Sequence, residues 1–177
     1  MKRQFNKLMK SVGITTSTLL IAITCQAHGF AQWGVASAHP GTKHFSDVKW
    51  AEFGSSGEKG RLAYTVGVGG WKDGTNYVGS SNIGGLQEKA RDSFFFEALL
   101  GVEPKAEHFY LTYKLGPSII THTDALLGSN VQMAHELGFG MYDKRNVRVG
   151  LVLKHFSNAG LVRPNLGRDF VGLRIEW

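Results

Sequence analysis

The sequence predicts an all-β protein, an eight-stranded antiparallel transmembrane β-barrel. Three observations predict this fold. Eight segments of about ten residues alternate apolar and polar side chains, short and longer connections alternate between these segments, and one face of the segments is apolar while the other carries charge. With 177 residues, 42% of them hydrophobic, the chain has the size of one domain and too much apolar content for a disordered chain.

An N-terminal segment precedes the strands and has the layout of a secretory signal peptide. Met1 to Lys10 is basic, Ser11 to Thr24 carries no charge, and small residues follow. We expect residues 1–27 to be removed on export, with cleavage as late as Ala31 as the alternative, and residues 28–177 to form the barrel domain. The apolar stretch of about fourteen residues is shorter than the roughly twenty that a membrane-spanning helix requires.

Charge and cysteine content exclude two further classes of protein. The formal charge is +6, but four of the positive charges belong to the predicted signal peptide, so about +2 remains on the barrel. No clustered basic patch accompanies that charge, and we therefore expect no nucleic-acid partner. The single cysteine, Cys25, also lies in the predicted signal peptide, which excludes a disulfide framework and a cysteine-rich metal site.

The eight expected strands follow one another along the chain. They lie near residues 31–39, 45–53, 60–71, 92–102, 107–120, 130–142, 146–157 and 168–177. The second is the least regular, because Lys49 interrupts its apolar positions. The last four show the alternation most clearly. Their apolar face holds Phe109, Leu111, Tyr113, Leu115, Val131, Met133, Leu137, Phe139, Met141, Val147, Val149, Leu151, Leu153, Val171, Leu173 and Ile175.

The connections between the strands indicate a membrane barrel. Tight connections at 103–106 and 143–145 alternate with longer ones at 72–91, 121–129 and 158–167. An even number of strands joined in this way is typical of outer-membrane barrels, and closure removes the unpaired edges of an open sheet. The terminal aromatic residue, Trp177, resembles the C-terminal signal by which such barrels are recognised, so we expect the barrel assembly machinery as a partner.

A soluble barrel of the lipocalin type is the alternative fold, since it too has eight strands. The two are distinguished by polarity, because a soluble barrel has its apolar face inside and its polar face in water. Here the charged face is expected to form interior ion pairs, and the apolar face is expected to contact lipid. The charged face comprises Glu97, Lys114, Glu136, Arg148, Lys154, Arg174 and Glu176. Eight strands leave just enough interior for side chains, so no wide pore is expected.

Three polar residues stand out on the apolar face. His155 and Ser157 lie two residues apart at the end of the seventh strand, and Asp169 opens the eighth strand on the same face. If the N-terminus is periplasmic, this end of the barrel lies at the cell surface. A hydroxyl, an imidazole and a carboxylate are the residue set for nucleophilic catalysis. The alternative is that they are unrelated polar residues at a wet strand end, which need no further explanation.

The loop after these residues carries a resemblance to a known family. His155-Phe156-Ser157-Asn158-Ala159-Gly160-Leu161, followed by Pro164-Asn165 and Gly167, resembles the His-Tyr/Phe-Ser-Asn-Ala-Gly motif of the PagL family. Those proteins are eight-stranded outer-membrane barrels that remove the ester-linked 3-hydroxyacyl chain at the 3 position of lipid A. The resemblance therefore implies lipid A or lipopolysaccharide as the substrate, a serine hydrolase mechanism without metal or cofactor, and the outer membrane as the location.

The resemblance also implies a role for each matching residue. Ser157 would be the nucleophile, His155 the general base, and Asn165 with the backbone N–H of Gly160 the oxyanion donors, with Asn158 in support. The orienting acid of the family is typically a glutamate fourteen residues after the histidine. Asp169 occupies that position here and is one methylene shorter, which requires closer strands or a tilted histidine.

Other functions stay open at this point. A non-enzymatic small barrel, such as an adhesin or a membrane-integrity protein, would have no requirement for Ser157 or His155. An outer-membrane phospholipase would use the same residues on another ester, and a soluble periplasmic carrier would correspond to the lipocalin alternative. The other histidines share no ligand spacing, so no metal site is expected. The sequence is compatible with a monomer or a homodimer, and outer-membrane lipids are expected to surround it.

Overall fold

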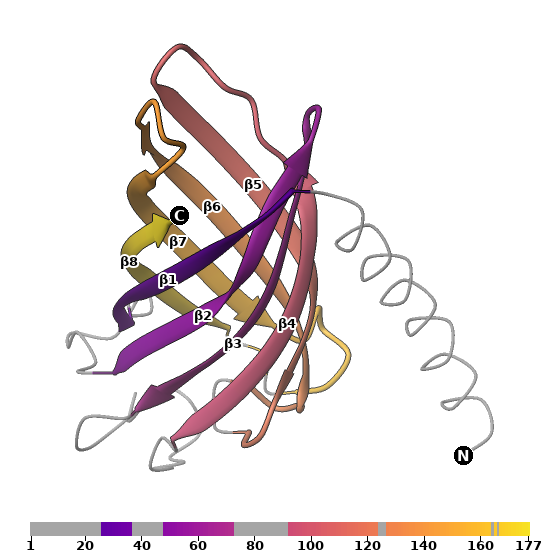
Figure 1. Ribbon diagram of the computed structural model, residues 1–177. Helices are drawn as coiled ribbons and strands as arrows, with labels where there is room; N and C mark the ends of the chain where they lie inside the picture. The colour runs from indigo at the N-terminus through magenta and orange to yellow at the C-terminus, as the bar shows by residue number, and fades with distance from the viewer. Residues whose placement is uncertain (1–25, 37–47, 73–91, 124–126, 164, 166) are drawn as a thin grey trace.

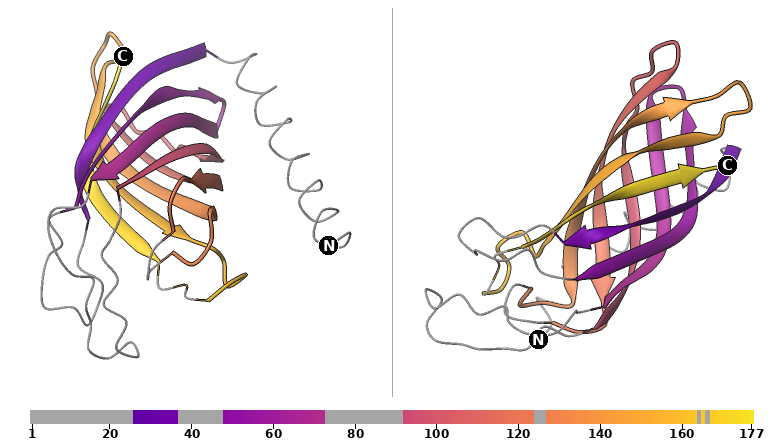
Figure 2. Two further views of the ribbon diagram at one scale, coloured as in Figure 1. Left: turned by 90° about the horizontal axis from the view of Figure 1, so that it is seen from below. Right: turned by 90° about the vertical axis from the view of Figure 1, so that its left-hand side faces the viewer.

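Eight antiparallel strands close into a barrel in chain order (Figure 1). The computed structural model describes residues 26–36, 48–72, 92–123, 127–163, 165 and 167–177. The strands are β1 (Gln26–Ala36), β2 (Lys49–Lys59), β3 (Leu62–Lys72), β4 (Ser93–Val102), β5 (Phe109–Ile120), β6 (Val131–Tyr142), β7 (Arg148–Ser157) and β8 (Arg168–Glu176). The barrel closes because β1 pairs with both β2 and β8, so that the first and last strands lie side by side in both views of Figure 2.

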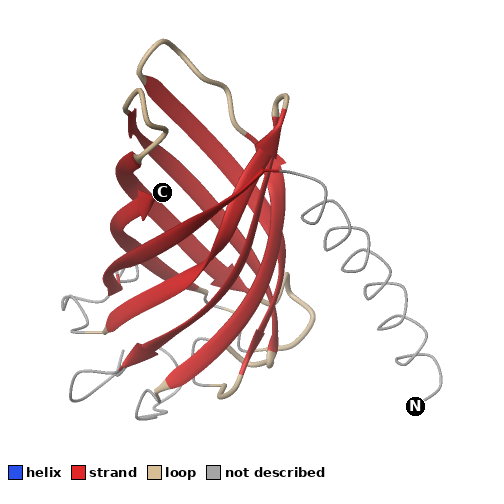
Figure 3. Ribbon diagram, viewed as in Figure 1, coloured by secondary structure: helices blue, strands red, loops and turns tan. Residues whose placement is uncertain are grey.

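Strands and loops make up the described part of the chain (Figure 3). Within it, no helix has the length and apolar character needed to cross a membrane. The connections at 60–61, 103–108 and 143–147 lie at one end of the barrel, at the top of Figure 1. The β7–β8 connection lies at the opposite end, and β7 therefore runs toward that end with Ser157 as its last residue.

The distribution of apolar side chains identifies a membrane barrel and rules out the lipocalin alternative. Large hydrophobic side chains are exposed all around the outside. They include Phe53, Val68, Phe94, Ile119, Phe139, Leu151 and Leu173. The charged positions predicted for the interior are all buried. An apolar outer surface around a polar interior is the reverse of a soluble barrel, and it is the pattern that lipid requires.

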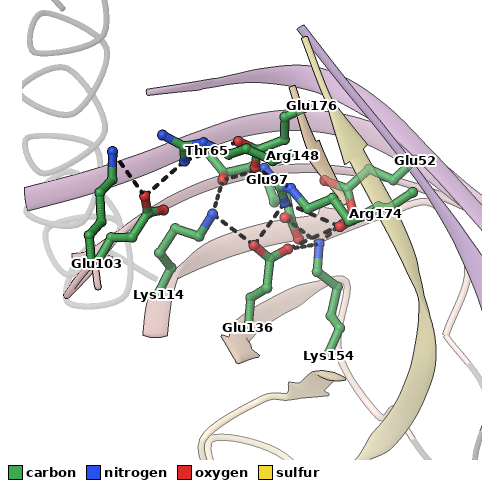
Figure 4. Close-up of polar contacts among 12 residues, drawn as sticks. Glu52, Thr65, Glu97, Glu103, Lys114, Glu136, Arg148, Lys154, Arg174 and Glu176 are labelled. Atoms are coloured by element: carbon green, nitrogen blue, oxygen red, sulfur yellow. Dashed lines mark hydrogen bonds and ion pairs between the residues drawn. The ribbon is translucent and has the colours of Figure 1, made fainter. Parts of the chain in front are cut away.

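Buried charges fill the middle of the barrel as one connected network (Figure 4). The Lys154 ammonium lies at its centre and contacts Glu52, Glu97 at 2.6 Å and Glu136 at 3.1 Å. Glu136 also accepts from Lys114 and Arg174, each at 2.9 Å. Each of these charges therefore has at least one opposite charge within contact distance, which offsets the cost of removing it from water. The predicted interior ion pairs are confirmed.

Aromatic side chains fill the barrel interior between this network and the β7–β8 end. Phe156, which is fully buried, contacts Trp71, Phe95 and Phe170 with ring centroids 5.1–5.9 Å apart. Phe156 and Lys154 are consecutive inward positions of β7. Because successive side chains alternate between faces, anchoring these two inside obliges His155, between them, to point outward. The interior packing thus sets the orientation of the outer-face residues.

The strand boundaries differ from the expected ones most at the beginning of the chain. β2 extends to Lys59, six residues beyond the expected end. The small and polar residues from Gly54 to Glu58 are typical of a turn, but in the structure they pair with both β1 and β3. In consequence Glu52, which the sequence did not assign to a face, joins the interior network. β1 begins at Gln26, five residues earlier than expected. The predicted signal peptide lies, up to residue 25, outside the described residues.

The extent of β1 bears on the two cleavage positions considered above. Phe30 and Ala31 pair with Glu176 and Ile175 of β8, and Gly29 exchanges two backbone hydrogen bonds of 3.0 Å with Trp177. Cleavage after Ala31 would remove these pairs from the β1–β8 seam and leave only those from Gln32 to Ala36. Cleavage after Ala27 keeps them, and it stays our prediction.

Candidate functional site

His155 of β7 lies directly opposite Asp169 of β8 on the outer face of the barrel. The imidazole Nδ1 and the carboxylate Oδ1 are 2.6 Å apart, and both side chains are about two-fifths exposed. A charge-assisted hydrogen bond at this distance is short and strong. Direct cross-strand pairing explains how the shorter aspartate reaches the imidazole, because side chains of such a pair are neighbours on one face. Because the contact with Asp169 uses Nδ1, the Nε2 atom of His155 is available to another group.

Gly167 lies against the Cε1–Nε2 edge of this imidazole, the edge away from Asp169. Its φ is +78°, in the left-handed region, and a Cβ placed on it would lie 2.5 Å from Cε1 and 3.2 Å from Nε2 of His155. Since Phe156 pairs with Arg168, Gly167 is one position further toward the barrel end, level with Ser157. The Nε2 edge of the imidazole is therefore turned toward the end of the barrel where the serine lies.

Ser157 is the last residue of β7 and shares the outer face with His155. Its side chain is partly exposed, and its register partner on β6 is Met133. Among the described residues, no hydrogen bond joins its hydroxyl to His155. A nucleophile–base hydrogen bond often reaches its full strength only in the complex with substrate. The structure thus places the three predicted side chains on one face, with the contact between His155 and Asp169 formed.

The β7–β8 loop folds around two asparagines. The Asn158 side chain is buried and its amide donates to the Val162 carbonyl at 2.7 Å, while its backbone N–H donates to Asn165 Oδ1 at 2.8 Å. Asn165 also forms an isolated β-bridge with Leu127 of the β5–β6 connection. With its carbonyl oxygen engaged, Asn165 keeps its amide N–H groups as donors. Pro164 lies outside the described residues.

Gly160 lies at the exposed tip of the loop. Its φ is +76°, and a Cβ there would meet nothing within 4 Å. The preceding Ala159 also has a positive φ, of 53°, an uncommon backbone conformation for a residue with a side chain. Two successive left-handed residues turn the chain tightly. No hydrogen bond in the described part of the chain brings the Gly160 N–H to the other predicted site residues.

Two features of the site were not found from the sequence. His135 of β6 is the direct cross-strand partner of His155 on the side away from Asp169, although it was grouped with histidines that share no pattern. The strand alternation alone places it on the outer face, but its register with His155 is a tertiary property. Gly167 was noted only as part of the motif, and its contact with the imidazole depends on the β7–β8 register.

One cluster has the composition of a metal site, but it lies inside the barrel. Carboxylate oxygens of Glu52, Glu97 and Glu136 come within 4.8 Å of one another. The Lys154 ammonium contacts all three and supplies the positive charge that a cation would otherwise provide. This cluster is separated from the outer face that carries His155.

The fold and the outer-face contacts define a class of protein: a small transmembrane barrel with a hydroxyl, an imidazole and a carboxylate gathered on its lipid-facing side. Comparison with known proteins identifies the family within that class. The family model described as lipid A 3-O-deacylase (PagL) matches residues 42–177, and the chain belongs to this family. The lipid A deacylase PagL of Bordetella bronchiseptica is 32% identical over 186 residues, covering 96% of each chain.

A solved structure supports the architecture. The crystal structure of the outer membrane enzyme PagL superimposes with a TM-score of 0.53 and 17% sequence identity, covering 85% of this chain and 97% of that one. At this identity the likeness concerns the fold. It agrees with the eight-stranded barrel described above.

Proposed function

We propose that this protein is an outer-membrane lipid A 3-O-deacylase that uses Ser157, His155 and Asp169 as its catalytic residues. The observation that carries the proposal is the 2.6 Å contact between His155 and Asp169 on the lipid-facing side, two residues from a serine. A carboxylate that fixes Nδ1 of a histidine, next to a serine, is the arrangement of serine hydrolases. Membership of the family and the name of the Bordetella relative support lipid A as substrate.

The reaction follows from this geometry in two steps. Ser157 Oγ attacks the carbonyl carbon of the 3-linked ester and its proton passes to Nε2 of His155. The bond to the sugar oxygen then breaks, that oxygen takes the proton from His155, and the acyl chain stays on Ser157. In the second step His155 takes a proton from water, the resulting hydroxide attacks the acyl carbonyl, and the free 3-hydroxy fatty acid leaves while the proton returns to Ser157.

Each remaining residue has a place in this scheme. Asp169 holds Nδ1–H and stabilises the imidazolium that forms. The amide of Asn165 and the backbone N–H of Gly160 are the proposed donors to the tetrahedral oxyanion, each worth about 3–4 kcal/mol in comparable sites. Asn158 holds Asn165 and the loop in position. The barrel assembly machinery remains a predicted partner, and the chain is compatible with a monomer or a homodimer.

The outer-face location suits a lipid substrate. The site is flanked by exposed apolar residues of the same strands, Leu153 and Val171, which contact acyl chains in a membrane. An ester of a lipid in the same leaflet therefore reaches Ser157 by lateral diffusion, without leaving the membrane. This placement favours an enzyme over an adhesin, because lipid-facing polar groups are costly without a function or a partner.

The proposal is tested by mass spectrometry of lipid A from a Gram-negative host that expresses the protein, against the same host with an empty vector. We expect a loss of mass equal to one 3-hydroxyacyl chain, and the corresponding free acid in the lipid extract. Phospholipids from the same cells are measured in parallel. Unchanged lipid A together with newly formed lysophospholipids would replace the deacylase by the phospholipase alternative.

Gly167→Ala is expected to reduce deacylation by roughly 10²-fold, because the new Cβ displaces the imidazole that it would contact at 2.5 Å. The initial rate of fatty-acid release from lipopolysaccharide by the purified protein in detergent measures this. Gly60→Ala is the matched control: Gly60 also has a positive φ, of 66°, with nothing within 4 Å of a Cβ. A wild-type rate for Gly167→Ala would contradict a role for the imidazole contact, and an equal loss in both variants would assign the effect to backbone strain.

A further inference from the structure

Two polar groups that the proposed reaction does not use, His135 and Tyr113, lie next to His155 on the outer face. His135 of β6 lies directly opposite His155 of β7, which lies opposite Asp169 of β8, so that the three side chains form a row across three strands. Tyr113 of β5 extends the row, with its hydroxyl 2.9 Å from Nδ1 of His135. The surrounding outer positions are exposed and apolar, and include Leu115, Leu137, Leu153 and Val171.

The contact between the two histidines is specific in its geometry. Their ring centroids are 5.9 Å apart and their planes are inclined at 61°, an edge-to-face arrangement, which is a favoured geometry for aromatic pairs. The Tyr113 hydroxyl engages His135 at a ring nitrogen and so restricts rotation of that ring. His135 thus presents a fixed surface to the β6 side of His155.

A single hydrogen bond at Nδ1 does not by itself fix the plane of an imidazole. Asp169 contacts His155 through one oxygen, and the ring can pivot about that point. Gly167 lies against the Cε1–Nε2 edge but has no side chain. A contact on the opposite side of the ring removes the remaining freedom, and His135 provides that contact.

We propose that His135, held by Tyr113, is a positioning residue that orients the His155 imidazole toward Ser157 by packing against its β6 side. This inference rests on the proposed function, since it concerns the orientation of the proposed general base. His155 is then held from two strands, by a carboxylate on β8 and by an aromatic ring on β6. Correct orientation of the base is a transition-state requirement, so its loss lowers kcat more than it changes KM.

The test measures kcat and KM for lipopolysaccharide deacylation by the purified barrel in detergent, with heat-modifiability on gels as the measure of folding. We expect His135→Ala to lower kcat by roughly 10- to 100-fold with KM within about twofold. His135→Phe, which restores an aromatic ring without its nitrogens, is expected to recover most of kcat. Tyr113→Phe is expected to lower kcat less than His135→Ala, because the ring of His135 remains.

Two controls make the result specific. Phe139→Ala removes another exposed aromatic ring from the outer face of β6, four residues from His135, and is expected to leave kcat unchanged. In a His155→Ala background, His135→Ala is expected to cause no further loss, because a positioning residue acts only through the histidine that it positions.

The outcomes separate this inference from the proposed function. If the wild-type barrel deacylates and Ser157→Ala does not, while His135→Ala keeps full kcat, the positioning role is wrong and the function stands. A loss confined to KM would also overturn it, because His135 would then contact substrate directly. If Ser157→Ala is as active as wild type, the proposed catalytic residues themselves fail.

Discussion

Ser157→Ala is expected to abolish deacylation, lowering kcat/KM by roughly 10³- to 10⁶-fold, the range seen when a serine hydrolase loses its nucleophile. Without the hydroxyl no acyl-enzyme can form, and only substrate binding and oxyanion stabilisation remain. The fold has no need of this hydroxyl, since the side chain is partly exposed at the end of β7 and no hydrogen bond in the described part of the chain depends on it. The variant is therefore expected to be a folded, inactive barrel.

The measurement is the release of 3-hydroxy fatty acid from lipopolysaccharide by the purified variant, with lipid A masses from expressing cells as a second readout. Ser55→Ala is the matched control, because Ser55 of β2 is also partly exposed and shares the outer face with Phe53. We expect it to retain wild-type activity. Full activity in both variants would exclude Ser157 as nucleophile while leaving the deacylase activity itself in place.

Lys154→Met is expected to produce the largest loss of stability. The ammonium of this residue contacts Glu52, Glu97 and Glu136 at the centre of the barrel, and its removal leaves carboxylate oxygens within 4.8 Å of one another without that charge. Breaking a buried ion pair by removing one partner costs about 3–5 kcal/mol. Here a single ammonium group contacts three carboxylates. We expect the free energy of unfolding to fall by at least that amount.

Urea-induced unfolding in detergent, followed by tryptophan fluorescence, measures the free energy of unfolding. Lys105→Met is the control, because Lys105 lies outside the strands and its side chain is 31% exposed where it pairs with Glu58 and Glu103. Such exposed pairs are worth up to about 1 kcal/mol. A second variant, Lys154→Met with Glu97→Gln, is expected to recover part of the loss. Equal stabilities for Lys154→Met and Lys105→Met would contradict a central role for this network.

The network also helps to hold the part of β7 that carries the outer-face site. β7 presents Lys154 and Phe156 to the interior and His155 and Ser157 to the lipid. Lys154 is fixed by ion pairs and Phe156 by ring contacts, so the backbone between them is held on both sides of His155. A side chain on a well-held strand is more precisely placed than one on a loop. The interior side chains thus hold the backbone that carries the outer-face site, although they do not contact the site residues.

Much of this protein follows from its sequence alone. The two-residue period within each segment is a local property, and it was enough to predict eight strands, the membrane barrel and the faces of the apolar and charged residues of the later strands. The same alternation placed His155, Ser157 and Asp169 on one face, and the motif around them identified the family. The charged residues predicted for the interior, such as Lys154 and Glu136, are buried as expected.

The tertiary structure decided what depends on the register between strands. The period of a single strand does not specify which residue of its neighbour lies opposite, because register is set by hydrogen bonds between segments distant in sequence and by closure of the barrel. For this reason the extent of β2 and the burial of Glu52 were missed. The pairing of His135 with His155, and the approach of Gly167 to the imidazole, likewise emerged only when the strands were paired.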